Sequence, residues 1–147
     1  MKKEKAKEII EKYQLEHINH LQNSIDEKRV TVDIDEGEVL DPEDFSRQTE
    51  VGDLVLRLKR QLTVAKNDLK FVQKISLEPN DKVVLGSLVE THDMFFYVSI
   101  PTNTFDFEQK KLVGISTKAP IYRAMLNKTQ GDSFKVGTKT YTIQKIY

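Results

Sequence analysis

The sequence predicts an α+β protein in which an antiparallel coiled-coil hairpin of two helices precedes a small antiparallel sheet with one helix. Two observations support this prediction. Apolar residues recur at helical spacing through the first half of the chain. After Pro79 the pattern changes to short runs of β-branched and aromatic residues, which are typical of strands. We therefore place the hairpin in residues 1–76 and the sheet domain in residues 80–147.

Length and composition narrow the class of protein. A chain of 147 residues fits one or two domains. The absence of cysteine excludes disulfides and thiolate zinc sites. The amino-terminal segment lacks the apolar core of a signal peptide, and no apolar run approaches the roughly 18 to 20 residues of a membrane span. We therefore expect a cytoplasmic protein.

The first helix is expected from Lys2 to about Lys28, a segment without Gly or Pro. Its apolar positions form a narrow amphipathic stripe, with a slip near residues 14–17. These positions are Ala6, Ile9, Ile10, Tyr13, Ile18, Leu21 and Ile25.

The second helix has a clear start signal, because Asp41 can cap free amides and Pro42 suits the first helical position. Its apolar positions follow heptad steps of 4 and 3 residues, which indicates a coiled coil. They are Val51, Val55, Leu58, Leu62, Ala65, Leu69 and Val72. Two long stripes joined by a short connection favour an intramolecular hairpin, and a helical bundle or a parallel dimeric zipper are the alternatives. We expect a monomer.

Residues 31–44 form an acidic connection between the helices. This segment holds seven of the chain's 23 acidic residues and no Lys or Arg, so the rest of the chain has a net charge of +7. Its carboxylates belong to Asp33, Asp35, Glu36, Glu38, Asp41, Glu43 and Asp44. A solvated loop without a ligand is the simplest interpretation of such a run. A calcium-binding loop that starts at Asp33 is excluded, because its twelfth position would be Asp44, whereas such loops have a bidentate glutamate there.

The second half reads as a small sheet with one helix. Strands are expected at residues 82–90, 94–100 and 112–116, followed by a helix at 121–128 that Pro120 opens. Residues 133–136 and 140–146 are expected to close as a hairpin through Gly137 and Thr138.

Several segments of this half, in the same order, resemble conserved motifs of the Gre family of bacterial transcript-cleavage factors. Residues 114–128, GISTKAPIYRAMLNK, are similar to the family's segment xISxxSPIxRALLGK. Leu85-Gly86-Ser87-Leu88-Val89 resembles an early FGSxV strand, and Gly131-Asp132 with Thr140-Tyr141-Thr142-Ile143 resembles the family's ending. The resemblance covers roughly residues 80–147.

This resemblance implies an FKBP-like carboxy-terminal domain and a hairpin that enters the secondary channel of RNA polymerase. In the family, carboxylates at the hairpin tip help to hold a magnesium ion and a water, so that the polymerase itself cuts backtracked RNA. Asp41 and Asp44 stand where the family's tip acids do, and two carboxylates on a rigid support can complete a metal's coordination. The protein itself would not be an enzyme, and Mg²⁺ would be shared with the polymerase. Pro120, Ile121 and Arg123 are candidates for contact with the polymerase, although Arg123 is equally suited to an ion pair within the domain.

The chain departs from the family pattern after the tip acids, where Phe45-Ser46-Arg47 replaces an Asn-Ala-Glu-Tyr element. A Gre-like regulator that binds the polymerase without promoting cleavage is therefore the alternative. A prolyl isomerase is suggested by the implied fold alone. Direct DNA binding would be weak and salt-dependent, because no basic cluster exceeds three residues.

Other side chains suggest sites that the sequence does not support. His17 and His20 have a spacing compatible with a metal, but no third ligand lies nearby, so we expect surface residues. Ser116 and His92 lack the surroundings of a catalytic triad. The aromatic run of residues 95–97 is expected in the core of the sheet rather than on a base-stacking surface.

Overall fold

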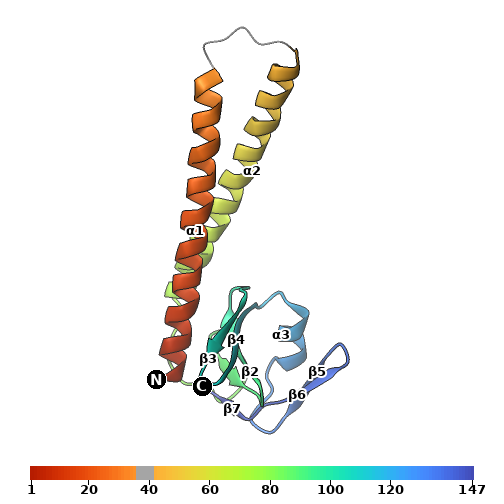
Figure 1. The fold of residues 1–147 in the computed structure, drawn as a ribbon. Coiled ribbons are helices and arrows are strands. Elements are labelled where there is room, and N and C mark those ends of the chain that lie inside the picture. Colours follow the sequence, from red (N-terminus) through yellow and green to blue (C-terminus); the bar gives the residue numbers. More distant parts are fainter. Residues whose placement is uncertain (36–41) are drawn as a thin grey trace. The chain divides into compact units, whose positions relative to one another are not determined.

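The computed structural model describes the backbone of residues 1–35 and 42–147, and the side chains of residues 1–29 and 48–147. Two long helices, α1 (Lys2–Asp35) and α2 (Pro42–Gln73), precede a five-stranded sheet, a short helix and a two-stranded hairpin (Figure 1). Contacts within the chain divide it into two compact units. The hairpin unit comprises residues 14–69, and the sheet unit comprises residues 1–13 and 70–147. The ends of both long helices thus belong to the sheet unit.

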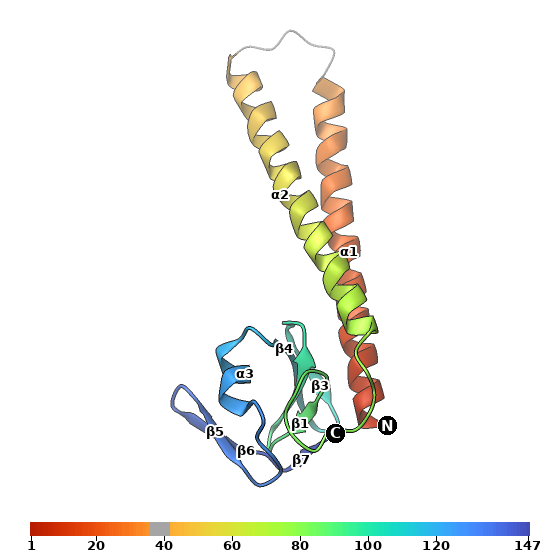
Figure 2. The same cartoon turned by 180° about the vertical axis from the view of Figure 1, so that it is seen from behind.

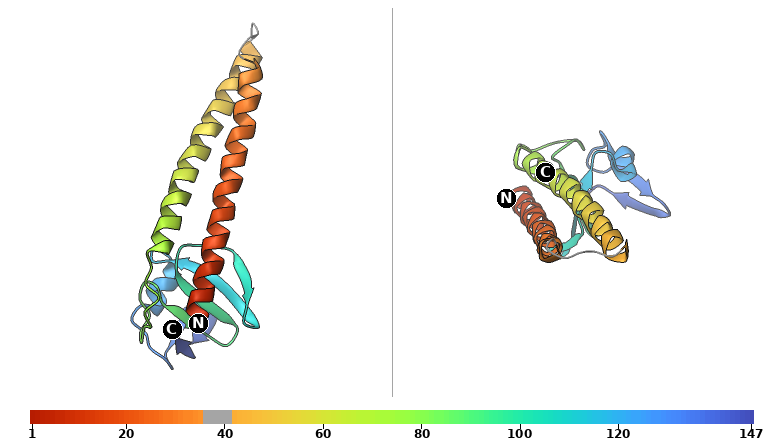
Figure 3. Two further views of the ribbon diagram at one scale, coloured as in Figure 1. Left: turned by 90° about the vertical axis from the view of Figure 1, so that its left-hand side faces the viewer. Right: turned by 90° about the horizontal axis from the view of Figure 1, so that it is seen from above.

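In the hairpin unit, α1 and α2 lie side by side and run antiparallel (Figure 3). Their shared core contains buried aliphatic side chains from both helices, and partly buried residues of the heptad seam pack against it. The buried members are Ile18, Leu21, Ile25, Leu62 and Ala65. This pairing within one chain confirms the predicted hairpin and replaces the bundle and the parallel zipper as descriptions of the two helices.

The stripe of α1 continues through the segment where the sequence suggested a slip. Gln14 is only 4% exposed, and its Nε2 donates a hydrogen bond of 2.9 Å to the carbonyl of Ala65 on α2. Lys3 is likewise buried at the start of the same stripe, which runs through residues 3, 6, 10, 14, 18, 21 and 25. The predicted slip was wrong because the buried polar side chain of Gln14 occupies the stripe position between Ile10 and Ile18 that a purely apolar pattern leaves out.

The sheet has the strand order β3-β4-β2-β1-β7. Its strands are β1 (Leu88–Glu90), β2 (Met94–Ser99), β3 (Thr104–Phe107), β4 (Lys110–Ser116) and β7 (Lys145–Ile146). β2 and β4 are parallel, in register from Met94 opposite Lys111 to Ser99 opposite Ser116. The other three pairings of the five-stranded sheet are antiparallel, as predicted, so the sheet is mostly antiparallel with one parallel pair. The chain reaches β4 through β3, which pairs antiparallel with β4 at the sheet edge.

The remaining elements are α3 (Pro120–Met125) and the hairpin of β5 (Ser133–Val136) with β6 (Lys139–Thr142). Figure 2 shows α3 and this hairpin on the same side of the sheet. The expected strand over residues 140–146 is divided into β6 and β7, because the Gln144 amide bonds to the Glu90 carbonyl at 2.8 Å and brings the chain into the five-stranded sheet.

The sheet is buried on both faces, since successive residues of a strand point to opposite sides. Phe95 and Tyr97 of β2 pack with the helix ends through Ala6, Ile10 and Val72. Phe96 and Val98 pack on the other side, in a core that also holds Met125, Phe134 and Ile143. The aromatic run thus lies in the core, as predicted. The FKBP-like character implied for this domain stays a prediction.

Candidate functional site

The acidic segment lies where one long helix ends and the next begins. The backbone of α1 continues past the expected end near Lys28 to Asp35, so Asp33 and Asp35 belong to its last turn. Glu43 and Asp44 belong to the first turn of α2, which opens at Pro42 as predicted. Glu36, Glu38 and Asp41 fall outside the described residues, as do the side chains of the four helical acids. Their proposed roles in metal binding therefore stay predictions.

The hairpin unit holds the two helices in one alignment. The hydrogen bond from Gln14 to Ala65 ties α1 to α2, and the aliphatic core of Ile18, Leu21 and Leu62 lies beside it. Because the helices run antiparallel, the end of α1 and the start of α2 lie at the same end of this unit (Figure 1). The acidic positions on the last turn of α1 and on the first turn of α2 are thus at one end of the hairpin unit, and they are up to 11 residues apart in the sequence, from Asp33 to Asp44.

The segment that resembles the Gre family forms β4, a turn and α3. Pro120 is the first residue of α3, and it follows Ala119, whose extended backbone is the helix cap. Pro120 and Arg123 are exposed, whereas Ile121 is partly buried against the core beneath the helix. Within the described part of the chain no acidic side chain forms an ion pair with Arg123. Arg123 is thus accessible to a partner.

Two large apolar side chains are exposed close to this segment. Leu126, just after α3, is 41% exposed, and Leu85, just before β1, is 43% exposed. Their segments are joined by backbone hydrogen bonds of 2.9 Å between Val83 and residues 127 and 128. Single exposed leucines are ordinary on protein surfaces, whereas arginine is enriched in protein interfaces, so Arg123 is the stronger sign of a binding surface here. The sequence motifs did not single out either leucine.

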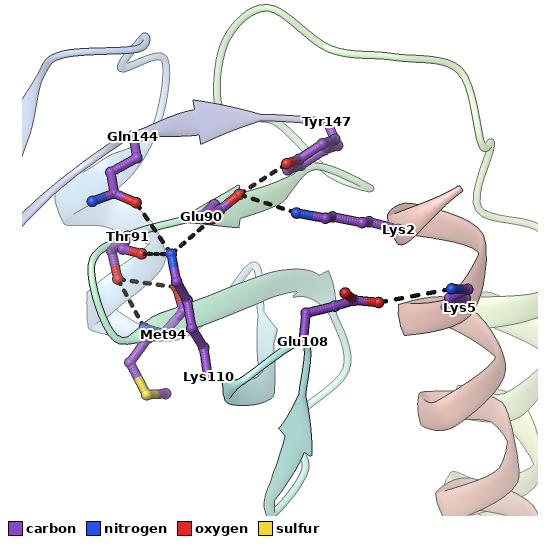
Figure 4. Close-up of polar contacts among 9 residues, drawn as sticks. All are labelled: Lys2, Lys5, Glu90, Thr91, Met94, Glu108, Lys110, Gln144 and Tyr147. Atoms are coloured by element: carbon purple, nitrogen blue, oxygen red, sulfur yellow. Dashed lines mark hydrogen bonds and ion pairs between the residues drawn. The ribbon is translucent and has the colours of Figure 1, made fainter.

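A half-buried ionic network in the sheet unit was also missed by sequence reasoning (Figure 4). The Glu90 carboxylate on β1 accepts hydrogen bonds from Lys110 Nζ at 2.7 Å and from the Tyr147 hydroxyl at 2.8 Å. Lys2 Nζ lies 3.9 Å from the same carboxylate. Burial alone would raise the pKa of Glu90, but the two donors and the nearby Lys2 outweigh it and lower that pKa.

Lys110 is the cationic centre of this network. Its ammonium also donates to the Thr91 carbonyl at 2.8 Å and to Gln144 Oε1 at 3.1 Å, and it lies 5.5 Å from the centre of the Phe95 ring. These partners come from separate elements of the sheet unit, so the network stabilises their arrangement. With every donor satisfied by the protein, Lys110 serves the fold rather than a ligand.

The other candidates have structural surroundings. His17 and His20 are exposed on α1, as predicted, and the described residues contain no group of three His, Cys, Asp or Glu that could hold a metal ion. The Ser116 hydroxyl accepts a hydrogen bond of 3.1 Å from the Lys118 amide, which places it in the turn before α3. Among the described helices, none is both long and apolar enough to cross a membrane.

Comparison with protein-family models finds no match, and comparison with curated proteins finds none either. Two solved structures are similar to this chain over most of its length. The transcription factor Gfh1 is 18% identical, with a TM-score of 0.36 over 93% of this chain and 92% of that one. The GreA factor homolog 1 (Gfh1) protein of Thermus thermophilus is 15% identical, with a TM-score of 0.35 over 93% of this chain and 94% of the other.

Proposed function

We propose that this protein is a Gre-like elongation factor that binds RNA polymerase through its secondary channel. Its acidic tip would assist the polymerase in the metal-dependent cleavage of backtracked RNA. The observation that carries this proposal is the position of the acidic segment between the end of α1 and the start of α2. A charged tip on paired helices is suited to reach an active centre that lies inside a narrow channel.

The dimensions of the helices support this proposal. The parts of α1 and α2 that belong to the hairpin unit, residues 14–35 and 42–69, are roughly 33 and 42 Å long at 1.5 Å per residue. A pair of helices is narrow, because each contributes a diameter of only about 10–12 Å with its side chains. The hairpin therefore combines length with a small cross-section, which is what a channel demands.

The chemistry proposed for the tip needs oxygen ligands rather than a catalytic group of its own. Mg²⁺ prefers carboxylate oxygens and water. Asp41 and Asp44 would contribute carboxylates toward a magnesium ion held by the polymerase, and the other tip acids would add negative charge around it. RNA cleavage would then be carried out by the polymerase, and any contact of this protein with nucleic acid would be indirect.

The second contact with the polymerase is proposed for the surface around α3. Arg123 is exposed without an ion-pair partner in the described part of the chain, and Pro120, Leu85 and Leu126 are exposed near it in the sequence or the fold. Arginine is among the residues that contribute most to protein interfaces. We expect Arg123→Ala to weaken polymerase binding by roughly tenfold, which corresponds to about 1.4 kcal/mol. Lys118→Ala, an exposed neighbour, is the matched control.

A second function is favoured by one sequence feature. Phe45-Ser46-Arg47 follows the tip acids where the Gre family has a different element. This difference favours a Gre-like regulator, which would bind the same channel of RNA polymerase and alter elongation without promoting RNA cleavage. The seven carboxylates would then act by their charge and bulk.

The test combines binding with cleavage. The full-length protein should be retained by purified core RNA polymerase, and it should release short RNAs from backtracked complexes. Asp41→Ala combined with Asp44→Ala should abolish RNA release and leave binding intact. Asp53→Ala combined with Asp81→Ala removes two exposed carboxylates elsewhere and should change neither. Binding without RNA release by the wild-type protein would select the second function, and absence of binding would refute both.

A further inference from the structure

The sheet unit contains a cavity of about 250 Å³ next to the start of α1. Its walls are mainly apolar and come from three parts of this unit: the start of the chain, the segment after α2 and the last strand. The apolar lining residues are Met1, Leu77, Pro79, Ile146 and Tyr147. Two lysines, Lys3 and Lys145, complete the lining. Apolar walls with a few polar groups are typical of sites for small molecules.

Lys3 is unusual for a lysine because its side chain is almost wholly buried, with 1% of the residue exposed. Its ammonium donates one hydrogen bond of 2.6 Å to the Glu78 carbonyl. An ammonium group has three N–H donors, and within the described residues no second hydrogen-bond acceptor contacts it. A buried charge with incomplete partners costs free energy unless a ligand supplies what is missing. Lys3 therefore has donors to offer an anion.

Three lysines, Lys2, Lys3 and Lys145, lie at or near the cavity, against the two carboxylates of Glu78 and Glu90. Lys145 Nζ lies 4.8 Å from the centre of the Tyr147 ring, and Lys2 Nζ lies 5.6 Å from the same centre. The nearby Glu90 carboxylate is already engaged by Lys110 and by the Tyr147 hydroxyl, so it does not neutralise these lysines fully. The partial positive charge of the first turn of α1, which begins at Lys2, adds to them.

We propose that this cavity binds a small amphipathic carboxylate. The apolar part of the ligand packs against Leu77, Pro79 and Ile146, and its carboxylate accepts hydrogen bonds from Lys3 and Lys145. The volume suits a short aliphatic or single-ring acid, because sites for drug-sized molecules usually exceed about 300 Å³. The site lies outside the acidic segment and the α3 surface, and the inference does not depend on the proposed function.

The pKa of Lys3 can report whether a bound ligand is charged. Burial lowers the pKa of Lys3, although the nearby Glu78 carboxylate opposes this effect. A bound carboxylate stabilises the charged ammonium and should raise that pKa. A neutral ligand of the same shape would leave the pKa lowered. A change in the pKa of Lys3 thus shows whether the carboxylate of the ligand binds next to the Lys3 ammonium.

The experiment is a titration of the full chain with octanoate, followed by NMR of the Ile146 and Leu77 methyl groups and of the Lys3 ammonium. We expect saturable binding of one octanoate, with a raised Lys3 pKa, and binding of octanol at least tenfold weaker. Lys3→Met should weaken octanoate binding by tenfold or more. Lys145→Gln should weaken it severalfold, and Lys118→Gln, an exposed lysine that does not line the cavity, should not change it.

Three results would overturn the proposal. They are the absence of saturable shifts at the cavity methyl groups, equal affinity for octanol and octanoate, and unchanged octanoate affinity in Lys145→Gln. Should Lys3→Met fail to fold, Lys145→Gln and the pKa of Lys3 in the wild-type protein still decide the question. RNA polymerase is not part of this test, so its result is separate from that of the proposed function.

Discussion

The hairpin unit and the sheet unit differ in how their side chains are buried. Among the described residues of the hairpin unit, the hydrophobic core has five buried side chains, all of them aliphatic, and Gln14 is a buried polar residue of the same unit. The sheet unit has two core clusters, which include the aromatic side chains Phe95, Phe96, Tyr97, Phe107 and Phe134. A helix in a pair buries only one stripe, whereas a sheet that is covered on both sides buries nearly every residue of its central strand.

This difference predicts that the hairpin unit opens at a lower free energy than the sheet unit. Local stability follows the number of buried apolar contacts, and the outer faces of the hairpin helices expose Leu15, Leu56 and Val64. The region that would contact the polymerase active centre is thus built on the less stable unit. Two substitutions test this comparison directly, and two more test polar groups inside the sheet unit.

The largest effect is expected for Phe96→Ala in the sheet unit. Its ring packs edge-on against Phe134 and Tyr141, with centroid distances of 6.0 and 5.3 Å, and joins β2 to the β5–β6 hairpin. Removing a buried ring of this kind costs about 3–5 kcal/mol of unfolding free energy. Urea denaturation measures the loss, and Phe71→Ala, at a 40% exposed position, is the control that should change little. Equal losses in both variants would contradict the assigned core.

A smaller effect, confined to the hairpin unit, is expected for Leu62→Ala. Leu62 is 8% exposed and belongs to the core shared by α1 and α2. The loss should be about 2–4 kcal/mol and should accelerate amide exchange in residues 14–69 more than in the sheet. Val64→Ala, at a 59% exposed position two residues along, should stay within about 0.5 kcal/mol. Equal acceleration of exchange in the sheet would show that the two units unfold together.

Glu90→Gln tests the ionic network of the sheet unit. The lowered pKa of Glu90 means that the folded state favours the charged carboxylate. This stabilisation is present above the ordinary glutamate pKa of about 4.3 and is lost as the pH falls through the lower folded value. We expect the variant to lose roughly 2 kcal/mol at pH 7, with a difference from wild type that shrinks on acidification below about pH 4.5. Thermal unfolding across this range is the measurement, and a difference that does not depend on pH would exclude the network.

The smallest effect has the opposite sign. The Tyr97 hydroxyl is buried without a hydrogen-bond partner among the described residues, and burial together with the Glu11 charge raises the pKa of Tyr97 to about 12. Tyr97→Phe should therefore stabilise the sheet unit by about 1 kcal/mol. The matched variant is Tyr147→Phe, which loses a hydrogen bond of 2.8 Å to Glu90 and should destabilise by a similar amount. A stability loss in Tyr97→Phe would mean that its hydroxyl has a partner such as a buried water.

The two units also differ in how far the sequence predicted them. The hairpin follows from the heptad steps of α2, because a coiled-coil pattern depends only on local spacing. The buried positions of Lys3 and Gln14 were not predicted, because the stripe was identified from apolar residues alone and both of these residues are polar. Gln14 is buried where α2 supplies the Ala65 carbonyl as its hydrogen-bond acceptor, and Lys3 is buried where the segment after α2 supplies the Glu78 carbonyl.

The sheet was predicted less completely because its pairing is not local. β3 carries the alternating Phe105 and Phe107 that a strand requires, but it is short and follows Pro101, so its signal was weak. The amino-acid sequences of β2 and β4 contain no pattern that indicates their parallel pairing. The network around Glu90 joins residues that are 20 and 57 positions apart, and only the strand register brings them together.

Sequence reasoning located the acidic segment and the start of α2 at Pro42. The chemistry assigned to Asp41 and Asp44 came from the family resemblance, since local spacing says nothing of a partner's metal. The exposure of Arg123 was left open by the sequence, and it follows from the position of α3 at the surface.

The hydrogen bond from Gln14 to Ala65 fixes the position of α1 along the axis of α2. Aliphatic side chains tolerate small sliding movements, because one methyl group can replace another at a seam. An amide that must meet one particular carbonyl does not, and a shift by one helical turn of about 5.4 Å would leave it buried without a partner. Gln14 therefore sets the axial alignment of α1 against α2, and with it how far the acids of one helix lie ahead of those of the other. Replacing Gln14 with leucine would keep the helices together while allowing that offset to vary.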